Sequence, residues 1–170
     1  MKTVLSIALI VSGLFILAGC PVSSTYPLGK KGEVKLDTHL LGTFENTAED
    51  VEANEVIISK GSETNTYSVH VSSKGSMFMA DGEDFTGWLA KLDDQTFFVL
   101  QQLIDGVATE TYYVYHIQID KNHSKFTTSD ITLKVNGTEA ITSIEAYREE
   151  VKASMTMDGF LAGTIEWTKN

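Results

Sequence analysis

The sequence predicts a mainly β protein, in which an antiparallel meander forms a barrel or a sandwich and is followed by one C-terminal helix and a last strand. Three observations lead to this prediction. From residue 38 onward, short stretches rich in Val, Ile, Thr, Tyr and Phe are separated by Gly, Asn, Asp and Ser. The intervening loops are short, whereas parallel strands would need long crossover segments. A single segment near the C-terminus has helical periodicity instead.

The first 19 residues have the pattern of a targeting segment. Lys2 precedes an apolar run over residues 4–18, which small residues follow. A transmembrane helix needs about 20 apolar residues, whereas the hydrophobic part of a signal peptide needs about 7 to 15 and then small residues at the cleavage site. We therefore expect residues 1–19 to be a cleaved signal peptide rather than a membrane-spanning or buried helix.

The end of this run, Leu17-Ala18-Gly19-Cys20, resembles the lipobox of bacterial lipoproteins. The resemblance implies cleavage between Gly19 and Cys20, a diacylglyceryl thioether on Cys20 and an acyl chain on the new amino group. One acyl chain binds a bilayer only marginally, so two or three chains would make the anchor durable. Pro21 stands where the enterobacterial inner-membrane retention signal has Asp. In a Gram-negative cell we therefore expect the outer membrane, on its periplasmic side.

Residues 20–37 are predicted to be the lipidated cysteine and a flexible tether, because they hold both prolines, Pro21 and Pro27, and have little apolar periodicity. A single β-rich domain over residues 38–170 follows. Cys20 is the only cysteine, so the domain has no disulfide, thiolate metal site or cysteine nucleophile. Its fold must depend on a hydrophobic core, for which a domain of this size is long enough.

The predicted strands cover residues 39–46, 54–60, 65–73, 76–80, 84–92, 95–104, 111–120 and 124–135. Tyr67, Val69 and Val71 share one face of their strand. In the strand over residues 111–120, both faces carry bulky side chains, and one of them holds Tyr113, Tyr115, Ile117 and Ile119. The apolar run over residues 97–100 predicts a strand that is covered on both faces. Another element must therefore pack against the sheet.

That element is predicted to be a helix over residues 142–156. Thr142 and Glu145 can form a capping box at its start. An apolar stripe would consist of Ile144, Tyr147, Val151 and Met155, with Glu149, Glu150 and Lys152 on the opposite face. Asp158 and Gly159 end the helix, and residues 160–167 form the last strand.

The order of these elements is similar to that of the lipocalin-like, or calycin, β-barrels. The first predicted strand contains Leu41-Gly42-Thr43-Phe44, which resembles the Gly-x-Trp motif that opens this fold, with Phe44 in place of the tryptophan. The resemblance implies a barrel whose interior is either a packed core or a small apolar pocket.

The sequence contains no strong metal or catalytic motif. His39, His70, His116 and His123 lack the helical spacing of zinc ligands, although His70 and His116 could meet on neighbouring strands. The turn Asp81-Gly82-Glu83-Asp84 could offer oxygens to calcium but lacks the twelve-residue loop pattern, so a solvated turn is favoured. Nucleophile-elbow, phosphate-loop and dinucleotide motifs are absent. We expect no metal, no cofactor and no enzymatic activity.

Charge and aromatic content set the expected partners. The formal net charge of -10, which becomes more negative once Lys2 is removed, argues against nucleic acid and against anionic lipid as partners. Aromatic side chains could line an apolar ligand pocket, but the core interpretation is favoured for each of them. They are Phe78, Phe85, Trp88, Phe97, Phe98, Tyr113, Tyr115 and Trp167.

Two functions remain open. The first is a non-enzymatic lipoprotein, anchored to the bilayer by Cys20, whose barrel binds a small apolar ligand. The alternative is a structural or assembly accessory that binds another envelope protein through a sheet edge or through the acidic loop at residues 45–55. An unfilled apolar cavity would favour the ligand carrier, and a filled barrel with an exposed apolar patch would favour the accessory protein.

Overall fold

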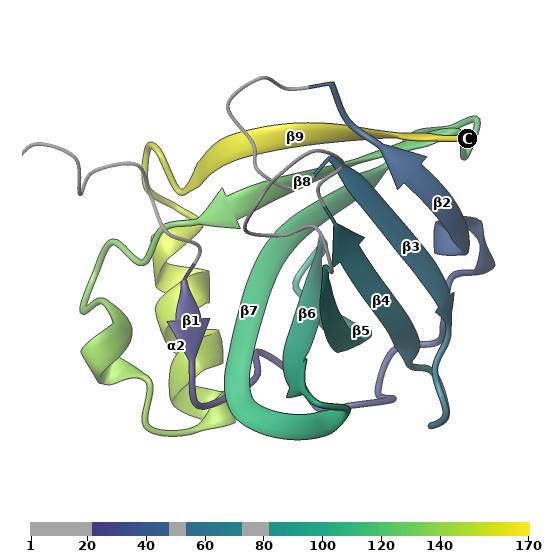
Figure 1. Ribbon diagram of the computed structural model, residues 1–170. Coiled ribbons are helices and arrows are strands. Elements are labelled where there is room, and N and C mark those ends of the chain that lie inside the picture. Colours follow the sequence, from purple (N-terminus) through teal and green to yellow (C-terminus); the bar gives the residue numbers. More distant parts are fainter. Residues whose placement is uncertain (1–21, 48–53, 73–81) are drawn as a thin grey trace, which may run out of the picture.

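The computed structural model describes residues 22–47, 54–72 and 82–170. In this part of the chain the strands from β2 to β9 form a closed antiparallel barrel, with one helix beside it (Figure 1). The strands are β1 (Ser23–Ser24), β2 (Gly42–Glu45), β3 (Glu55–Lys60), β4 (Tyr67–Ser72), β5 (Glu83–Leu92), β6 (Gln95–Ile104), β7 (Val107–Ile119), β8 (Lys125–Ile131) and β9 (Leu161–Lys169). The helix is α2 (Ile144–Ser154).

Each barrel strand pairs with the next one along the chain, and β2 pairs with β9 to close the barrel. Closure rests on Phe44 opposite Lys169 and Glu45 opposite Thr168. The predicted antiparallel meander is therefore confirmed, and it takes the barrel form rather than the sandwich. Closure also pairs the edges that an open sheet would leave free.

Most predicted strands match an observed strand within a few residues, and two differences have local causes. Residues 38–40 form the short 3₁₀ helix η1 (Thr38–Leu40), because the Asp37 carboxylate accepts a hydrogen bond from the His39 amide. The strand predicted at residue 111 begins at Val107, because Asp105 and Gly106 both have positive φ and make a tight hairpin turn. The strand predicted at residues 76–80 lies outside the described residues.

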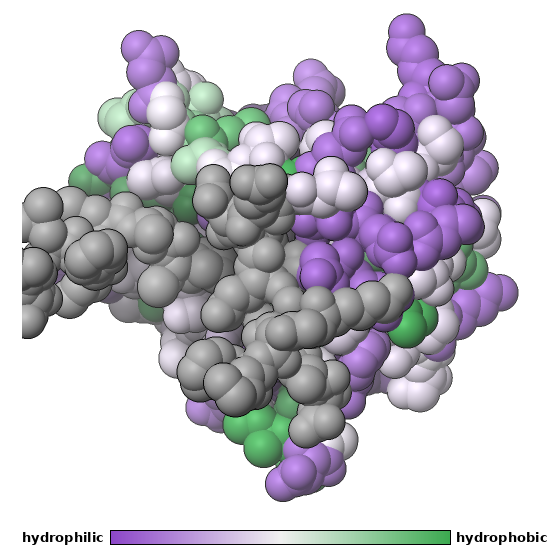
Figure 2. All heavy atoms as spheres, turned by 45° about the horizontal axis from the view of Figure 1, so that its top comes forward, coloured by the Kyte–Doolittle hydropathy of each residue, from purple (hydrophilic) through white to green (hydrophobic). Residues whose placement is uncertain are grey.

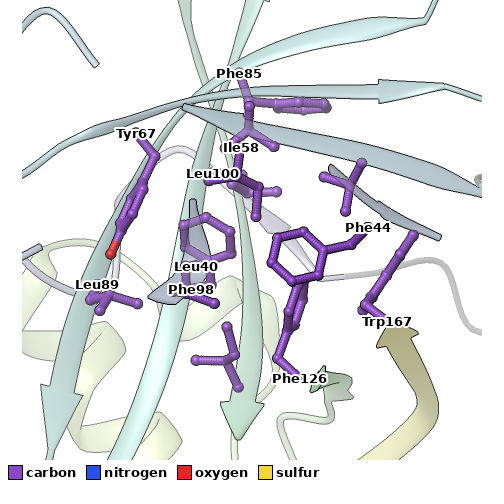
Figure 3. Close-up of a cluster of buried hydrophobic side chains, with 13 residues drawn as sticks. Leu40, Phe44, Ile58, Tyr67, Phe85, Leu89, Phe98, Leu100, Phe126 and Trp167 are labelled. Atoms are coloured by element: carbon purple, nitrogen blue, oxygen red, sulfur yellow. The ribbon is translucent and has the colours of Figure 1, made fainter. Parts of the chain in front are cut away.

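The barrel interior is filled by a cluster of buried hydrophobic side chains (Figure 3). Every strand from β2 to β9 contributes at least one of them. Aromatic rings fill the centre. Phe44 and Phe126 meet edge to face with ring centroids 4.8 Å apart, and Trp167 stacks on Phe126 at 6.2 Å. Tyr67 and Val69 are buried in this cluster and Val71 packs against it, so the prediction that these three residues share one face is confirmed.

A second hydrophobic layer lies between α2 and the outside of the barrel. Phe97 and Val99 of β6 face this layer, whereas Phe98 and Leu100 face the interior. The prediction that residues 97–100 are covered on both faces is therefore confirmed. From the helix, Tyr147 and Val151 are fully buried in the layer, as the predicted stripe required.

Two details of the predicted helix are wrong. Ser143 rather than Thr142 is the N-cap, and its hydroxyl accepts a hydrogen bond from the Ala146 amide at 3.0 Å. Glu150 is buried rather than exposed with Glu149. Its carboxylate lies against the loop that follows β8, where backbone amides replace water as hydrogen-bond donors.

Residues 22–37, which we call the N-terminal strap, pack along the barrel in contrast to the flexible tether predicted over residues 20–37. β1 pairs with Tyr112 and Tyr113 of β7. Leu28 is fully buried in the outer layer, and the Gly29 carbonyl accepts a hydrogen bond from the Trp88 indole at 3.0 Å. A few anchored residues hold the strap in place, although the segment as a whole has the composition of a loop.

The predicted signal peptide, its predicted cleavage position and Cys20 lie outside the described residues. Among the residues that are described, no helix is long and apolar enough to cross a membrane.

Candidate functional site

The aromatic residues considered as pocket-lining candidates belong to the two hydrophobic layers. Phe85, Phe98 and Trp167 are buried in the interior cluster, and Tyr113 and Tyr115 pack against it. Trp88 and Phe97 lie in the outer layer under α2. Phe78 lies outside the described residues. The core interpretation is therefore confirmed for the buried members of this set.

The inner wall of the barrel also carries polar groups, at the position where Tyr115 of β7 pairs with Asp130 of β8. Burial raises the pKa of the Tyr115 phenol, and the negative charge of Asp130 raises it further. Burial also raises the pKa of the Asp130 carboxyl. Gly163 makes room for this carboxylate, because a Cβ there would lie 2.7 Å from Asp130 Oδ2.

A cleft of about 850 Å³ opens at the end of the barrel where the β5–β6 turn meets the strap. Its lining combines apolar side chains, among them Leu89 and Ile117, with charged side chains of both signs. The basic ones are Lys35 and Lys91, and the acidic ones are Glu33, Asp37 and Asp94. The lining is therefore mixed, with charged groups beside apolar ones.

His116 lines the cleft but is almost fully buried. Its Nε2 atom lies 2.7 Å from Gln95 Oε1, and its ring meets that of Phe97 edge to face. Burial lowers the pKa of the imidazole, which is therefore neutral at pH 7. Its contacts are those of a structural histidine.

The metal pair considered for His70 and His116 is not formed. His70 of β4 pairs with Asp84 of β5, its Nδ1 atom 2.8 Å from the carboxylate oxygen. Two further strands, β5 and β6, separate β4 from β7, so the two histidines do not lie on neighbouring strands. The meander order places them apart, whereas sequence alternation alone left them free to meet.

Sequence reasoning missed a different histidine pair. The rings of His39 and His123 stack with centroids 3.6 Å apart and an angle of 11° between their planes. His39 also lies 2.8 Å from the Asp37 carboxylate, through its Nδ1 atom. The two histidines are far apart in sequence and no periodicity connects them, so only the folded chain reveals the pair. It joins η1 to the turn between β7 and β8.

The acidic segments offer no metal centre in the described part of the chain. Glu83 and Asp84 are strand residues at the start of β5 rather than members of a solvated turn. Asp81 and most of the acidic loop at residues 45–55 lie outside the described residues. In the described ranges, no group of three or more histidine, cysteine or carboxylate side chains is arranged to hold a metal ion.

Two groups of exposed hydrophobic side chains stand out on the surface. Ile104 and Val107, which are 58% and 68% exposed, flank the turn between β6 and β7, and we call residues 104–107 the hairpin tip. Val135, Met157 and Leu161 are 45%, 44% and 40% exposed. Val135 and Met157 lie on the segments that join β8, α2 and β9, and Leu161 is the first residue of β9; we call the three residues the corner patch. Figure 2 shows hydrophobic areas at the bottom and at the upper left of a largely polar face.

Comparison with known proteins assigns no family. No protein-family model, no curated protein and no solved structure matches the chain significantly. The barrel architecture occurs in many protein families and is not specific to lipocalins. The functional argument therefore depends on the interior, the cleft and the exposed side chains of this chain.

Proposed function

We propose that this protein is a non-enzymatic lipoprotein of the bacterial envelope, anchored by acylated Cys20, whose barrel is a rigid scaffold that binds another envelope protein. The observation that carries this proposal is the combination of a filled barrel with an exposed apolar hairpin tip. The lipobox resemblance of residues 17–20 supports the anchor, and Pro21 in place of the retention signal's Asp supports the outer membrane in a Gram-negative cell.

The filled interior weighs against the small apolar ligand that a lipocalin-like barrel would suggest. A site for such a ligand needs an apolar cavity of about 300–1,000 Å³ that encloses most of the molecule. Aromatic side chains from strands that are not direct neighbours meet inside this barrel instead, as with Phe44 of β2 and Phe126 of β8. The cleft at the barrel end is open and carries charges of both signs, which would be costly to bury under an apolar molecule.

The hairpin tip favours a protein partner. Water surrounds Ile104 and Val107, and a partner that covers them would gain about 25 cal/mol for each Å² of apolar surface removed from water. The tip is also held in shape. A bulge near Gln101 interrupts the β6–β7 register, and there the Gln101 side chain donates to the Thr109 carbonyl at 2.7 Å. A preordered tip loses less conformational entropy on binding.

Photocrosslinking in cells tests the partner directly. A photoreactive amino acid at Val107 is expected to give a discrete adduct with one envelope protein, which disappears when Ile104→Lys is added. The matched control is the same amino acid at Ile57, another exposed apolar position, on β3. No adduct at Val107, or the same adducts from both positions, would contradict the proposed partner surface.

Native mass spectrometry separates the accessory protein from the ligand carrier. The protein purified without detergent and lacking its acyl chains is expected to have its sequence mass before and after denaturation. A bound mass that is released on unfolding would make the carrier the better hypothesis. Cys20→Ser tests the anchor, because it should abolish palmitate incorporation and either release the protein or leave the signal peptide uncut.

A further inference from the structure

We propose that the corner patch rests on the lipid bilayer, so that the barrel lies directly on the membrane with its hairpin tip turned away from it. This inference rests on the proposed acylation of Cys20. It names the surface that touches lipid, which the anchor alone does not determine.

The first step is the length of free chain. Only Pro21 and Val22 separate Cys20 from β1, which is hydrogen-bonded to β7. Three residue steps span at most about 11 Å even when fully extended. Leu28 and the hydrogen bond from Trp88 to Gly29 hold the rest of the strap against the barrel. An acylated Cys20 therefore keeps the start of β1 within about 11 Å of the lipid headgroups.

The second step is where β1 joins the barrel. β8 pairs with β7 as far as Asp130 opposite Tyr115, and β1 then pairs with the same edge of β7, with Ser23 opposite Tyr113. The chain thus reaches the barrel at the corner where β8 leaves it. Figure 1 shows the end of β8 and the start of β9 close to the start of β1.

The third step is that the corner patch belongs to this corner. Val135 follows β8, Met157 follows α2, and Leu161 is the first residue of β9. The segments are tied together, since the Thr132 amide donates to the Phe160 carbonyl at 2.7 Å and the Lys134 amide donates to Ser154 Oγ at 2.8 Å. The three exposed side chains therefore belong to segments that meet at this corner of the barrel.

The chemistry of this surface fits the interface of a bilayer. Its apolar side chains are each about half exposed, and Lys134 lies beside Gly159, where a Cβ would be 3.5 Å from its ammonium nitrogen. A lysine beside apolar groups can place its charge at headgroup level. Asp158, and Glu150 whose carboxylate accepts hydrogen bonds from the Val135 and Asn136 amides, bring negative charge to the same corner, so the surface suits zwitterionic lipid rather than anionic lipid. A spacing of about 11 Å also leaves no room for a folded protein between the start of β1 and the lipid.

The hairpin tip faces the other way. From Ser24 back to Ser23, the chain moves along β7 from Tyr112 to Tyr113, which is away from Val107. Val107 lies six positions before Tyr113 on β7, or about 20 Å in an extended strand. In Figure 1 the β6–β7 turn lies at the bottom of the view, below the corner of β8 and β9.

Lipid quenching of a fluorescent label tests this orientation on the full lipidated protein. Met157→Cys and Val107→Cys each supply one reactive thiol, because acylation occupies the sulfur of Cys20. Each variant is labelled with the fluorophore NBD and reconstituted in phosphatidylcholine vesicles that carry a nitroxide on a fraction of the lipids. Quenching is expected to be several-fold stronger at position 157 than at position 107.

A spacer tests whether the short link to Cys20 is what holds this corner against the lipid. Twenty Gly and Ser residues inserted between Pro21 and Val22 add about 25 Å of flexible chain and should weaken the quenching at position 157 while the protein stays in the vesicle fraction. Equal quenching at both positions without the spacer would overturn the orientation and leave the anchor intact, whereas quenching at position 157 that the spacer does not change would support the orientation and show that the corner patch stays on the lipid by its own contacts. Failure of the protein to take up palmitate and to enter the vesicles would refute the anchor and, with it, this inference.

Discussion

Glu150 shows how one buried side chain organises a long loop. Its carboxylate accepts hydrogen bonds from the amides of Val135, Asn136 and Gly137, and the Asn136 side chain binds its second oxygen at 2.9 Å. Burial alone would raise the pKa of this carboxyl, but the hydrogen bonds outweigh burial and lower it. The charged form is therefore the one that holds the loop between β8 and η2 (Thr138–Ala140).

Glu150→Gln should destabilise the protein at pH 7. The substitution removes the charge that strengthens these hydrogen bonds and sets an amide group against Asn136, so we expect a loss of about 1–3 kcal/mol in the free energy of unfolding. Urea denaturation followed by circular dichroism measures it. The matched control is Glu149→Gln, an exposed neighbour on α2, for which a change within about 0.5 kcal/mol is expected.

The pH dependence of this difference has a definite sign. The folded protein holds the Glu150 pKa below its ordinary value of 4.5, so the unfolded chain takes up the proton first as pH falls. The stability from this group is fully present above pH 4.5 and disappears as pH drops through the folded-state pKa. The gap between the wild type and Glu150→Gln should therefore narrow below pH 4.5. A gap that stays constant down to pH 3 would show that the charge of Glu150 is not its source.

At the scale of the element, the start of α2 separates two adjacent residues that the sequence leaves nearly equivalent. Ser143 caps the Ala146 amide, whereas Thr142 is exposed and is outside the helix. Ser143→Ala should lower the free energy of unfolding by about 1 kcal/mol, and Thr142→Ala should change it by much less. Thermal or urea unfolding of the two variants gives the answer. Equal losses at both positions would show that the cap is not confined to Ser143.

The strap makes a sharper prediction, because a flexible tether and a packed segment respond differently to the same substitution. Leu28 is fully buried against Trp88 and its neighbours under α2. Leu28→Ala should lower the free energy of unfolding by about 2–5 kcal/mol, as buried leucine truncations do. Leu161→Ala, the same change at a 40% exposed position, is the control and should lower it by less than half as much. Similar small losses of stability at both sites would favour the flexible tether over the packed strap.

Local sequence patterns predict the elements of this fold well, but they fail where a contact with a distant part of the chain determines whether a residue is buried. The alternation around Tyr67 and the apolar run at residues 97–100 follow from strand geometry, and both are confirmed. Local patterns do not predict the packing of the strap. Its composition is that of a loop, and the burial of Leu28 depends on α2, which is more than 100 residues away. The burial of Glu150 is not predicted for the same reason, since nothing in the helical pattern indicates that a loop will bring backbone amides to its carboxylate.

At the scale of the whole molecule, the meander predicts which strands are neighbours but not which pair closes the barrel. Closure by Phe44 and Lys169 brings the first and last barrel strands together, and no periodicity in the sequence indicates it. The same distinction, between neighbours that the meander predicts and contacts that only the folded barrel makes, applies to the candidate sites. The meander order separates His70 from His116, and the stacking of His39 on His123 depends on how η1 crosses the barrel end.

Burial of tyrosines throughout the core should make the whole barrel sensitive to alkali. Burial raises the pKa of Tyr67 to about 12 and also raises the pKa of Tyr115 and Tyr147 above the ordinary value of 10.0. Between pH 10 and these higher values the unfolded chain loses phenolic protons that the folded chain retains. The stability is therefore fully present below pH 10 and falls as pH rises, by about 1.4 kcal/mol per pH unit for each such proton.

Tyr147→Phe isolates one of these protons. The Tyr147 hydroxyl is buried and has no hydrogen-bond partner among the described residues, so its removal should leave the fold intact and preserve or raise the stability at pH 7. Urea denaturation between pH 8 and pH 11.5 should then show that the free energy of unfolding falls less steeply with pH for the variant, because the contribution of the Tyr147 proton is missing. The ultraviolet absorbance of tyrosinate should confirm that ionisation accompanies unfolding. If the phenolate absorbance rose fully while the barrel stayed folded, the tyrosines would have access to solvent. The barrel interior would then not be tightly packed, and the argument against a bound ligand would lose its basis.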